Sequence, residues 1–389
     1  MLALEAKNPL LSDIKSAIEN IIFTGNQANG SVISTNIISI TDKLRHEILK
    51  ILVSYSDKIP HPASGTESIK GDKYKADKAH LNTFSNTLIR WQILAYVASI
   101  DLTIAKWFES HLDALSILHE LGYEQATQGL WAVWAAEGHP LRYQQGKISG
   151  TKAWCSGANI VDYGLITYRN ERGHAQLLMV DMQQSGIKID NSAWQAVGMQ
   201  ATDTATIHLD QVVASNVGAA NAYLERVGFW HGAAGVAACW YGAATCLASY
   251  LISAYQQKPN DYKAMYLGQI GTALAVTEQY FHHIAELIDN EPTQSHELAI
   301  RQLRSNVEQI AREVIDVIGQ ALGAAPFCNN AHFARLSADL TVFIRQSHGA
   351  FDLQKIGELS SMLASESASK LASDDTSDFI NRQGNIWQL

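Results

Sequence analysis

A segment without any Asp, Glu, Lys or Arg runs from Val227 to Ala254, and it constrains the fold more than any other feature of the chain. It is long enough to cross a bilayer as a helix. However, it is built mainly from Gly, Ala, Ser, Cys and Thr, and His231 lies within it. Because small residues let neighbouring helices approach closely, we expect a central helix buried in a bundle or between subunits, and no membrane span.

Composition narrows the class of protein. The 389 residues are 47% apolar and 17% charged, which is ample material for a core and for more than one domain. The formal net charge of −9 argues against a nucleic-acid-binding protein, which would carry a basic face. The four cysteines form no CxxC pair, so we expect neither a disulfide scaffold nor structural zinc. With no apolar leader at the N-terminus, these features predict a cytoplasmic protein.

The spacing of apolar residues changes twice along the chain. Helical spacing predicts a helix over residues 37–56 and, after a polar loop at 57–79, two more over 84–121. Short alternating runs between 147 and 210 then predict an antiparallel sheet with hairpins, and helical spacing returns from 219. We therefore expect an α+β protein with an N-terminal helical domain (1–121), a middle β domain (122–218) and a C-terminal helical bundle (219–389). Strand and helix do not alternate and no GxGxxG is present, which argues against a Rossmann-type fold.

Two local patterns resemble reactive sites but have simpler explanations. Ser149 and Lys152 match the SxxK spacing of serine acyl-enzymes, which needs both residues on one helical turn, whereas this run lies in a predicted hairpin. Glu278, His282 and Glu286 share a helical face that could hold a metal, but paired ExxH motifs on two helices are missing. We interpret that face as solvated and expect no metal site.

Three stretches in a fixed order resemble the acyl-CoA dehydrogenase family of flavoproteins. They are Gly150-Thr-Lys-Ala-Trp-Cys-Ser-Gly-Ala158, then Gly198-Met-Gln-Ala-Thr-Asp-Thr-Ala205, and then Leu224-Glu-Arg226 before the Gly/Ala-rich helix. The resemblance covers about residues 84–354 and implies the same α–β–α fold. It also implies FAD as the cofactor.

The resemblance assigns residues to the flavin. Trp154 resembles the aromatic residue that lies against the flavin ring, and Ser156 resembles the hydroxyl that donates to flavin N5. Ala135 and Ala136 match a strand end whose backbone contacts the isoalloxazine, although the family usually has a Thr where Ala136 stands.

A further element, Gln320 to Gly323, resembles the family's Q-x-x-G-G motif, which meets the flavin pyrophosphate of a neighbouring subunit. The family continues with a second Gly, and this chain has Ala324 instead. We therefore expect a homodimer or homotetramer that binds FAD.

The family reaction needs a base. A carboxylate removes the α-proton of an acyl thioester while the β-hydride goes to flavin N5. His348 stands where the usual Glu would be, followed by Gly349, and Glu225 occupies the family's second base position, followed by Arg226. Glu225 and His348 are thus the catalytic candidates, and Arg226 and Gly349 are assigned to the substrate. Glu225 could instead simply compensate the positive end of a helix.

Three functions remain open on this basis. The first is an FAD-dependent oxidoreductase acting on the CH–CH group of an acyl thioester and passing electrons to an acceptor flavoprotein. The second is a flavin-dependent monooxygenase or oxidase on the same fold, whose members lack the usual Glu. The third is a non-catalytic homologue that binds an acyl thioester or a flavin.

Overall fold

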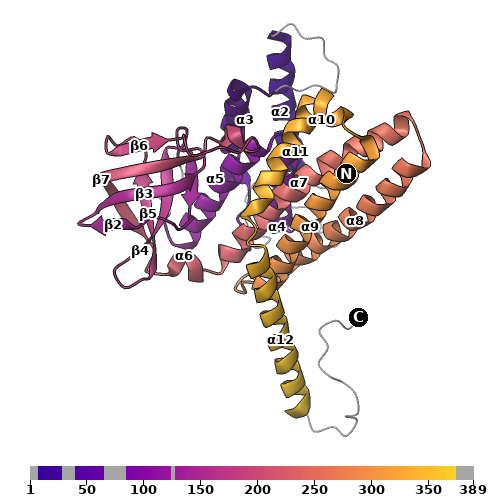
Figure 1. Cartoon of the computed structure of the whole chain (residues 1–389). Coiled ribbons are helices and arrows are strands. Elements are labelled where there is room, and N and C mark those ends of the chain that lie inside the picture. The colour runs from indigo at the N-terminus through magenta and orange to yellow at the C-terminus, as the bar shows by residue number, and fades with distance from the viewer. Residues whose placement is uncertain (1–7, 29–39, 65–84, 124–127, 374–389) are drawn as a thin grey trace, which may run out of the picture.

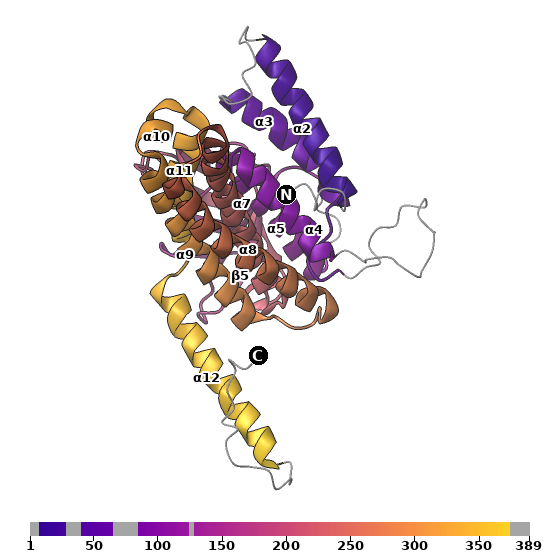
Figure 2. The ribbon, with the colours of Figure 1, turned by 90° about the vertical axis from the view of Figure 1, so that its right-hand side faces the viewer.

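A computed structural model of the chain shows a body of packed helices with a β-sheet against one side (Figure 1). The structure describes residues 8–28, 40–64, 85–123 and 128–373. The last helix extends away from this body in both views (Figures 1 and 2).

Helices precede and follow the sheet in the chain. Those before the sheet are α2 (Pro9–Ala28), α3 (Asp42–Ser54), α4 (Asn86–Ile100) and α5 (Leu102–Glu120), with the short turn η1 (Ser56–Lys58). Those after it are α6 (Ala222–Glu225), α7 (Gly228–Gln257), α8 (Asp261–Asn290), α9 (Glu297–Leu322), α10 (Ala325–Asn329), α11 (Ala331–Phe343), η3 (Ile344–Gln346) and α12 (Ala350–Ser373).

The sheet has the strand order β1-β4-β5-β7-β3-β2, and β6 also pairs with β7. Its strands are β1 (Trp131–Trp134), β2 (Leu141–Gln144), β3 (Lys147–Cys155), β4 (Tyr163–Arg169), β5 (Ala175–Asp181), β6 (Ile187–Asp190) and β7 (Ala205–Val217), with the turn η2 (Gln200–Thr202) before β7. The long strand β7 joins the two halves, because it pairs with β3 and β6 near its start and with β5 near its end.

Helix α5 connects the two parts of the molecule. Asp101 caps its start by accepting hydrogen bonds from the backbone N–H groups of Thr103 and Ile104. One face of α5 packs into the main helical core, while Ala114, Ile117 and other residues near its end pack against the sheet. A helix buried on both faces has a fixed position, so side chains on α5 are well placed to form a site between sheet and bundle.

Helix α7 is the charge-free segment, and it lies inside the bundle between α4 and α9. A Cβ on Gly242 would lie 2.1 Å from the Ala95 carbonyl oxygen of α4, so a glycine is required for this close crossing. In the described part of the chain, α7 is the one helix with the length and composition of a membrane span, and 61% of its most apolar window is buried in the protein. The expectation of a buried central helix is confirmed.

The α+β class and the helix–sheet–helix order are confirmed. The helix α2 was not expected, and the details differ in three further places. The helix expected from residue 37 begins at Asp42, where the Thr41 side chain accepts from the Leu44 N–H. The sheet is not wholly antiparallel, since β1 pairs parallel with β4; the chain passes through β2 and β3 before it returns beside β1. The strand β2 was not expected.

The expected domain boundaries stay a prediction. The last helix before the sheet ends at Glu120, the strands lie within 131–217 and α6 begins at Ala222. Of the expected loop at 57–79, the part after residue 64 lies outside the described residues.

Candidate functional site

A cavity of about 230 Å³ lies where the sheet meets α5 and the start of α7. We call it the sheet-side cavity. It contains four of the residues that the resemblance assigns to the flavin, and its lining residues are Lys106, Glu109, Ser110, Asp113, Val133, Trp134, Ala135, Ala136, Trp154, Ser156, Tyr223, Val236 and Gln346.

Trp154 is presented to this cavity by an irregularity in β3. The register of β3 against β7 shifts between Lys152 and Cys155, and Trp154 has a left-handed φ of 64°. A bulge of this kind re-aims a side chain, and a non-glycine residue at positive φ is often found at ligand sites. Trp154 is 64% exposed, and its ring meets that of Trp194 edge-on at 6.1 Å between centroids. A large aromatic surface is thus left free for a planar ligand.

The backbone at Ala135 and Ala136 is held from behind by a buried lysine. Lys152 donates from Nζ to the Thr167 carbonyl at 2.7 Å, and the Thr167 hydroxyl donates to the Ala135 carbonyl at 3.0 Å. Burial lowers the pKa of Lys152 to about 8. Ser149 and Lys152 lie in a strand and not on a helix, so the SxxK spacing is a coincidence, as expected.

The Ser156 hydroxyl ends a chain of three hydroxyl groups. Thr202 donates to the Met199 carbonyl at 2.7 Å, so its single proton is already used. Thr204 must therefore donate to Thr202, and Ser156 to Thr204, each at 2.8 Å. This order leaves the lone pairs of Ser156 Oγ, and not its proton, for a ligand in the cavity.

The α5 wall of the cavity is charged. Glu109 is 6% exposed, and its nearest cation is Lys106, with Nζ 3.7 Å from Glu109 Oε2. Burial raises the pKa of Glu109 to about 7, an increase that Lys106 opposes and Asp113 reinforces. Glu109 therefore exchanges a proton near neutral pH at the edge of a cavity, as a general acid or base must.

Asp113 also lines a second cavity of about 230 Å³, on the far side from Trp154. Arg226 lies in the wall of this second cavity and is only 8% exposed, and it donates to Glu120 at 2.9 Å and to Asp113 at 3.5 Å. The residue that sequence analysis assigned to the substrate is thus placed in a buried ion-pair network next to the sheet-side cavity.

The two predicted bases lie elsewhere. Glu225 is exposed at the end of α6, and the His348 side chain is 74% exposed, with Nδ1 3.8 Å from Asp352 Oδ2. Neither they nor Gly349 is among the residues that line the sheet-side cavity. The segment around His348 does reach the cavity, but through Gln346. The catalytic roles of Glu225 and His348 stay predictions.

Gln320 and Gly323 lie at the C-terminal end of α9, away from the sheet (Figure 1). Gln320 donates to Asp316 and accepts from the Tyr266 hydroxyl, and Gly323 ends the helix with a φ of 67°. Their role toward a neighbouring subunit stays a prediction.

Sequence reasoning missed Lys106, Glu109 and Asp113, although a signal was present. They are spaced i, i+3 and i+7 in a helix that is almost wholly buried, which places them on one helical face. Three charges on one face of a helix whose other faces carry large apolar residues indicate a buried polar site. Among the described residues, no three His, Cys, Asp or Glu side chains gather as a metal site.

Solved structures with the same fold were found, whereas no protein-family model and no curated sequence matches the chain. Butyryl-CoA dehydrogenase from Megasphaera elsdenii superimposes with a TM-score of 0.70 at 12% identity, over 90% of this chain and 97% of that one. The fold is that of the acyl-CoA dehydrogenases.

Two other solved structures share this fold. TdsC from Paenibacillus sp. A11-2, a dibenzothiophene monooxygenase crystallised with FMN and indole, has a TM-score of 0.68 at 14% identity over 90% of this chain and 95% of that one. A nitrososynthase from Micromonospora carbonacea var. africana has the same score and identity over 91% and 96%. At these identities the likeness establishes the fold alone.

The residues of the sheet-side cavity fit a flavin. Trp154 offers an open aromatic face, the Ala135–Ala136 strand end has no bulky side chain, and Ser156 offers a hydroxyl oxygen. A planar ring with hydrogen-bonding edges matches this set of contacts.

Proposed function

We propose that this protein is a flavin-dependent oxidoreductase that acts on a small, polar organic substrate, with oxygen as the oxidant. One observation carries the proposal: the cavity that holds Trp154 and Ser156 has Lys106, Glu109 and Asp113 in its opposite wall. A fatty acyl chain buried against these groups would remove water from the Lys106–Glu109 and Asp113–Arg226 ion pairs and offer them no hydrogen bond in exchange, which is unfavourable. A substrate that forms hydrogen bonds would not incur this penalty.

Trp154, Ser156 and the backbone of Ala135 and Ala136 would hold the flavin ring. When bound, the flavin would supply hydride acceptance at N5 or, in its reduced form, the activation of oxygen. Trp154 would exclude water from one side of the ring. Glu109 would take or return the substrate proton at its carboxylate, because its raised pKa keeps both protonation states populated near pH 7.

A second candidate is the dehydrogenation of an acyl thioester, with electrons passed to an acceptor flavoprotein. Glu109 favours it, since this reaction needs a carboxylate base of raised pKa inside the cavity. Glu225 and His348 are the alternative bases under either candidate. The monooxygenase TdsC and the nitrososynthase, both on this fold, support the first candidate by analogy.

The deciding experiment starts with the colour of the purified protein and the identity of the released flavin, FAD or FMN. Anaerobic stopped-flow absorbance then separates the functions. A dehydrogenase loses flavin colour with an acyl thioester alone. A monooxygenase needs chemically reduced flavin and then oxygen. A protein that shows neither reaction, or binds no flavin, contradicts the proposal.

Three variants identify the base in whichever reaction is found: Glu109→Gln, Glu225→Gln and His348→Gln. We expect Glu109→Gln to abolish the acidic limb of the pH–rate profile and to lower kcat by about 100-fold or more. The exposed Glu225→Gln and His348→Gln serve as matched controls and should change kcat less than about threefold. A large loss in either control, with Glu109→Gln unaffected, would move the base to that residue.

The assembly is part of the proposal. Exposed apolar side chains occur on α12, among them Phe351, Leu353 and Met362, and this helix leaves the body of the chain. A homodimer or homotetramer would cover them and would let Gln320 and Gly323 approach the flavin of a neighbouring subunit. Light scattering at micromolar concentration tests this, and a monomer would contradict it. A cytoplasmic location is also proposed, on the basis of the cysteine usage.

A further inference from the structure

A third and larger cavity, of about 400 Å³, lies within the helical body between α4, α7 and α8, with α2 at one end. We call it the helical cavity. Its walls are mostly apolar, and it shares no lining residue with the sheet-side cavity. Nothing in the proposed flavin chemistry uses it.

Aromatic rings form its floor. Trp91 and Phe281 meet edge to face at 5.6 Å, and Phe281 meets Tyr241 at 5.2 Å. The Tyr241 hydroxyl donates to the Leu274 carbonyl at 3.0 Å, so the ring is fixed in place. Such a surface accommodates an apolar or aromatic body, and its π-faces also attract organic cations.

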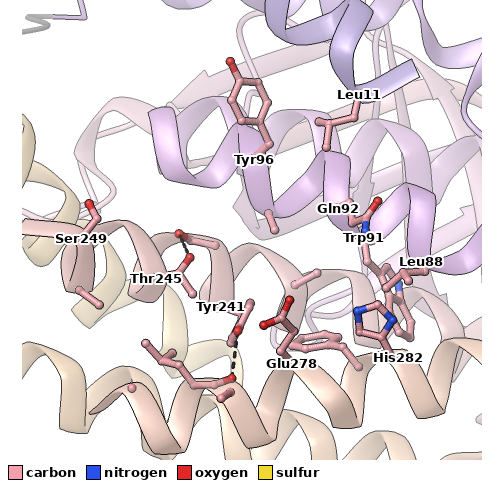
Figure 3. Close-up of a pocket in the computed structure, with 18 of the residues that line it drawn as sticks. Leu11, Leu88, Trp91, Gln92, Tyr96, Tyr241, Thr245, Ser249, Glu278 and His282 are labelled. Atoms are coloured by element: carbon pink, nitrogen blue, oxygen red, sulfur yellow. Dashed lines mark hydrogen bonds between the residues drawn. The ribbon is translucent and has the colours of Figure 1, made fainter. Parts of the chain in front are cut away.

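One end of the cavity holds polar groups without partners. Glu278 and His282 stand one turn apart on α8 and point into the cavity, His282 beside Leu88 and Trp91 of α4 and Glu278 beside Tyr241 of α7 (Figure 3). In the part of the chain that the structure describes, neither side chain has a hydrogen bond or an ion pair. The indole N–H of Trp91, a residue 2% exposed, is likewise without a hydrogen-bond partner there. A half-buried carboxylate left unpaired in an apolar cavity is unfavourable until a cation or donor reaches it.

The charge at this end selects the ligand. Besides Glu278 and His282, the charged group of the cavity is Lys15 of α2, whose ammonium lies 4.9 Å from the Tyr96 ring at the other end. The carboxylate end therefore repels anions and attracts cations. We propose that the helical cavity binds an organic amine, with its ammonium paired to Glu278 and its apolar body against Trp91, Tyr241 and Phe281.

The metal alternative for the Glu278–His282–Glu286 face is not supported. Glu286 is exposed and does not line the cavity, and no group of three potential ligands gathers among the described residues. Sequence analysis interpreted this whole face as solvated. In the structure only Glu286 is on the surface, whereas Glu278 and His282 line the cavity.

Calorimetry on the full-length protein with three probes of one shape tests the proposal: 2-phenylethylamine, 2-phenylethanol and phenylacetate. We expect the amine to bind most tightly and to change the fluorescence of Trp91. Glu278→Gln should weaken the amine by about tenfold and leave the alcohol unchanged, as loss of a charge-assisted contact predicts. The matched control Glu286→Gln, two turns further along α8, should leave all three affinities unchanged.

A second pair of variants tests the location without touching the charge. Ala275→Phe places a ring in the cavity and should abolish amine binding, whereas Val276→Phe, at a 65% exposed position next to it, should not. Thermal unfolding verifies that each variant folds. Equal affinity for the amine and the alcohol, no effect of Glu278→Gln, or no amine binding up to about 10 mM would overturn the proposal.

Discussion

Helix α7 borders both the sheet-side cavity and the helical cavity, but the two differ in their carboxylates. In the part of the chain that the structure describes, these are ion-paired in the first cavity and unpaired in the second. In the first, Glu109 has Lys106 within 3.7 Å, and Asp113 continues into the ion pairs of Arg226. In the second, Glu278 has no partner among the described residues. A paired buried charge can be maintained by the protein alone, whereas an unpaired one is most easily explained by a ligand. The contrast separates a site prepared for proton transfer from a site prepared for binding.

The largest expected effect concerns the wall of the helical cavity. Gly242→Ala would drive a methyl group against the Ala95 carbonyl, so α4 and α7 must separate, at a cost of about 2–3 kcal/mol in the free energy of unfolding. Urea denaturation measures it. The same change at Gly268 on α8, where a Cβ meets no atom within 4 Å, should instead stabilise by about 0.5–1 kcal/mol. Equal effects at the two positions would show that the close crossing is absent.

The next effect tests the buried carboxylate of the sheet-side cavity, Glu109, through the pH dependence of stability. The pKa of Glu109 is raised from 4.5 to about 7 by burial, so the folded state binds more protons than the unfolded state between these values. Stability from this group is present below pH 4.5 and is lost as the pH rises through 7. Glu109→Gln should therefore raise the free energy of unfolding at pH 8, by up to about 3 kcal/mol, and change it little at pH 4.5. Urea titrations at both pH values measure this; a pH-independent effect would contradict it.

A smaller effect tests whether the sheet-side cavity binds flavin through Trp154. Trp154→Ala removes the exposed aromatic face, and we expect the Kd for flavin to rise about tenfold, while Trp154→Phe keeps a ring and should raise it less. Fluorescence titration of free flavin measures both. The variant should leave amine binding in the helical cavity unchanged, and a loss at both sites would indicate a general loss of structure.

The smallest effect concerns the hydroxyl chain. Thr204→Val would release the Ser156 proton, which becomes free to donate to the ligand instead. We expect the ratio of affinities for oxidised and reduced flavin to shift about threefold toward the oxidised form, which presents an acceptor at N5. Because the oxidised form is favoured, the reduction potential of the bound flavin should fall, and spectroelectrochemical titration measures this. An unchanged potential would show that Ser156 does not face N5.

Much of the fold follows from local sequence pattern. The charge-free segment predicted α7, alternation predicted β3 to β7, and the glycines and polar residues between strands predicted the turns. Strand β2 was missed because Leu141 to Gln144 follows directly after Pro140 and contains no β-branched residue, whereas the equally short β6 has two isoleucines in alternation. The parallel pairing of β1 with β4 was missed because it joins segments that are far apart in the chain.

The candidate site was predicted in part. Motif order brought Trp154, Ser156, Ala135 and Ala136 to one cavity, because these residues lie on β3 or directly after β1 and β3, and local alternation sets the register of such strands. Glu225 and His348 were chosen by their positions in motifs that resemble the family's. A loop or a short helix can turn such a residue outward while a nearby residue, here Gln346, reaches the cavity.

By itself, the sequence determined most of the helical and strand segments, and which aromatic and hydroxyl residues accompany one another, since these depend on periodicity and neighbouring residues. The tertiary structure alone decided that Glu109 and Asp113 face Trp154, and that Glu278 and His282 stand in a cavity while Glu286 faces water. Whether a charge is buried, paired or exposed depends on which distant segments pack over it. That packing is a property of the whole chain and is not visible in the few residues around the charge.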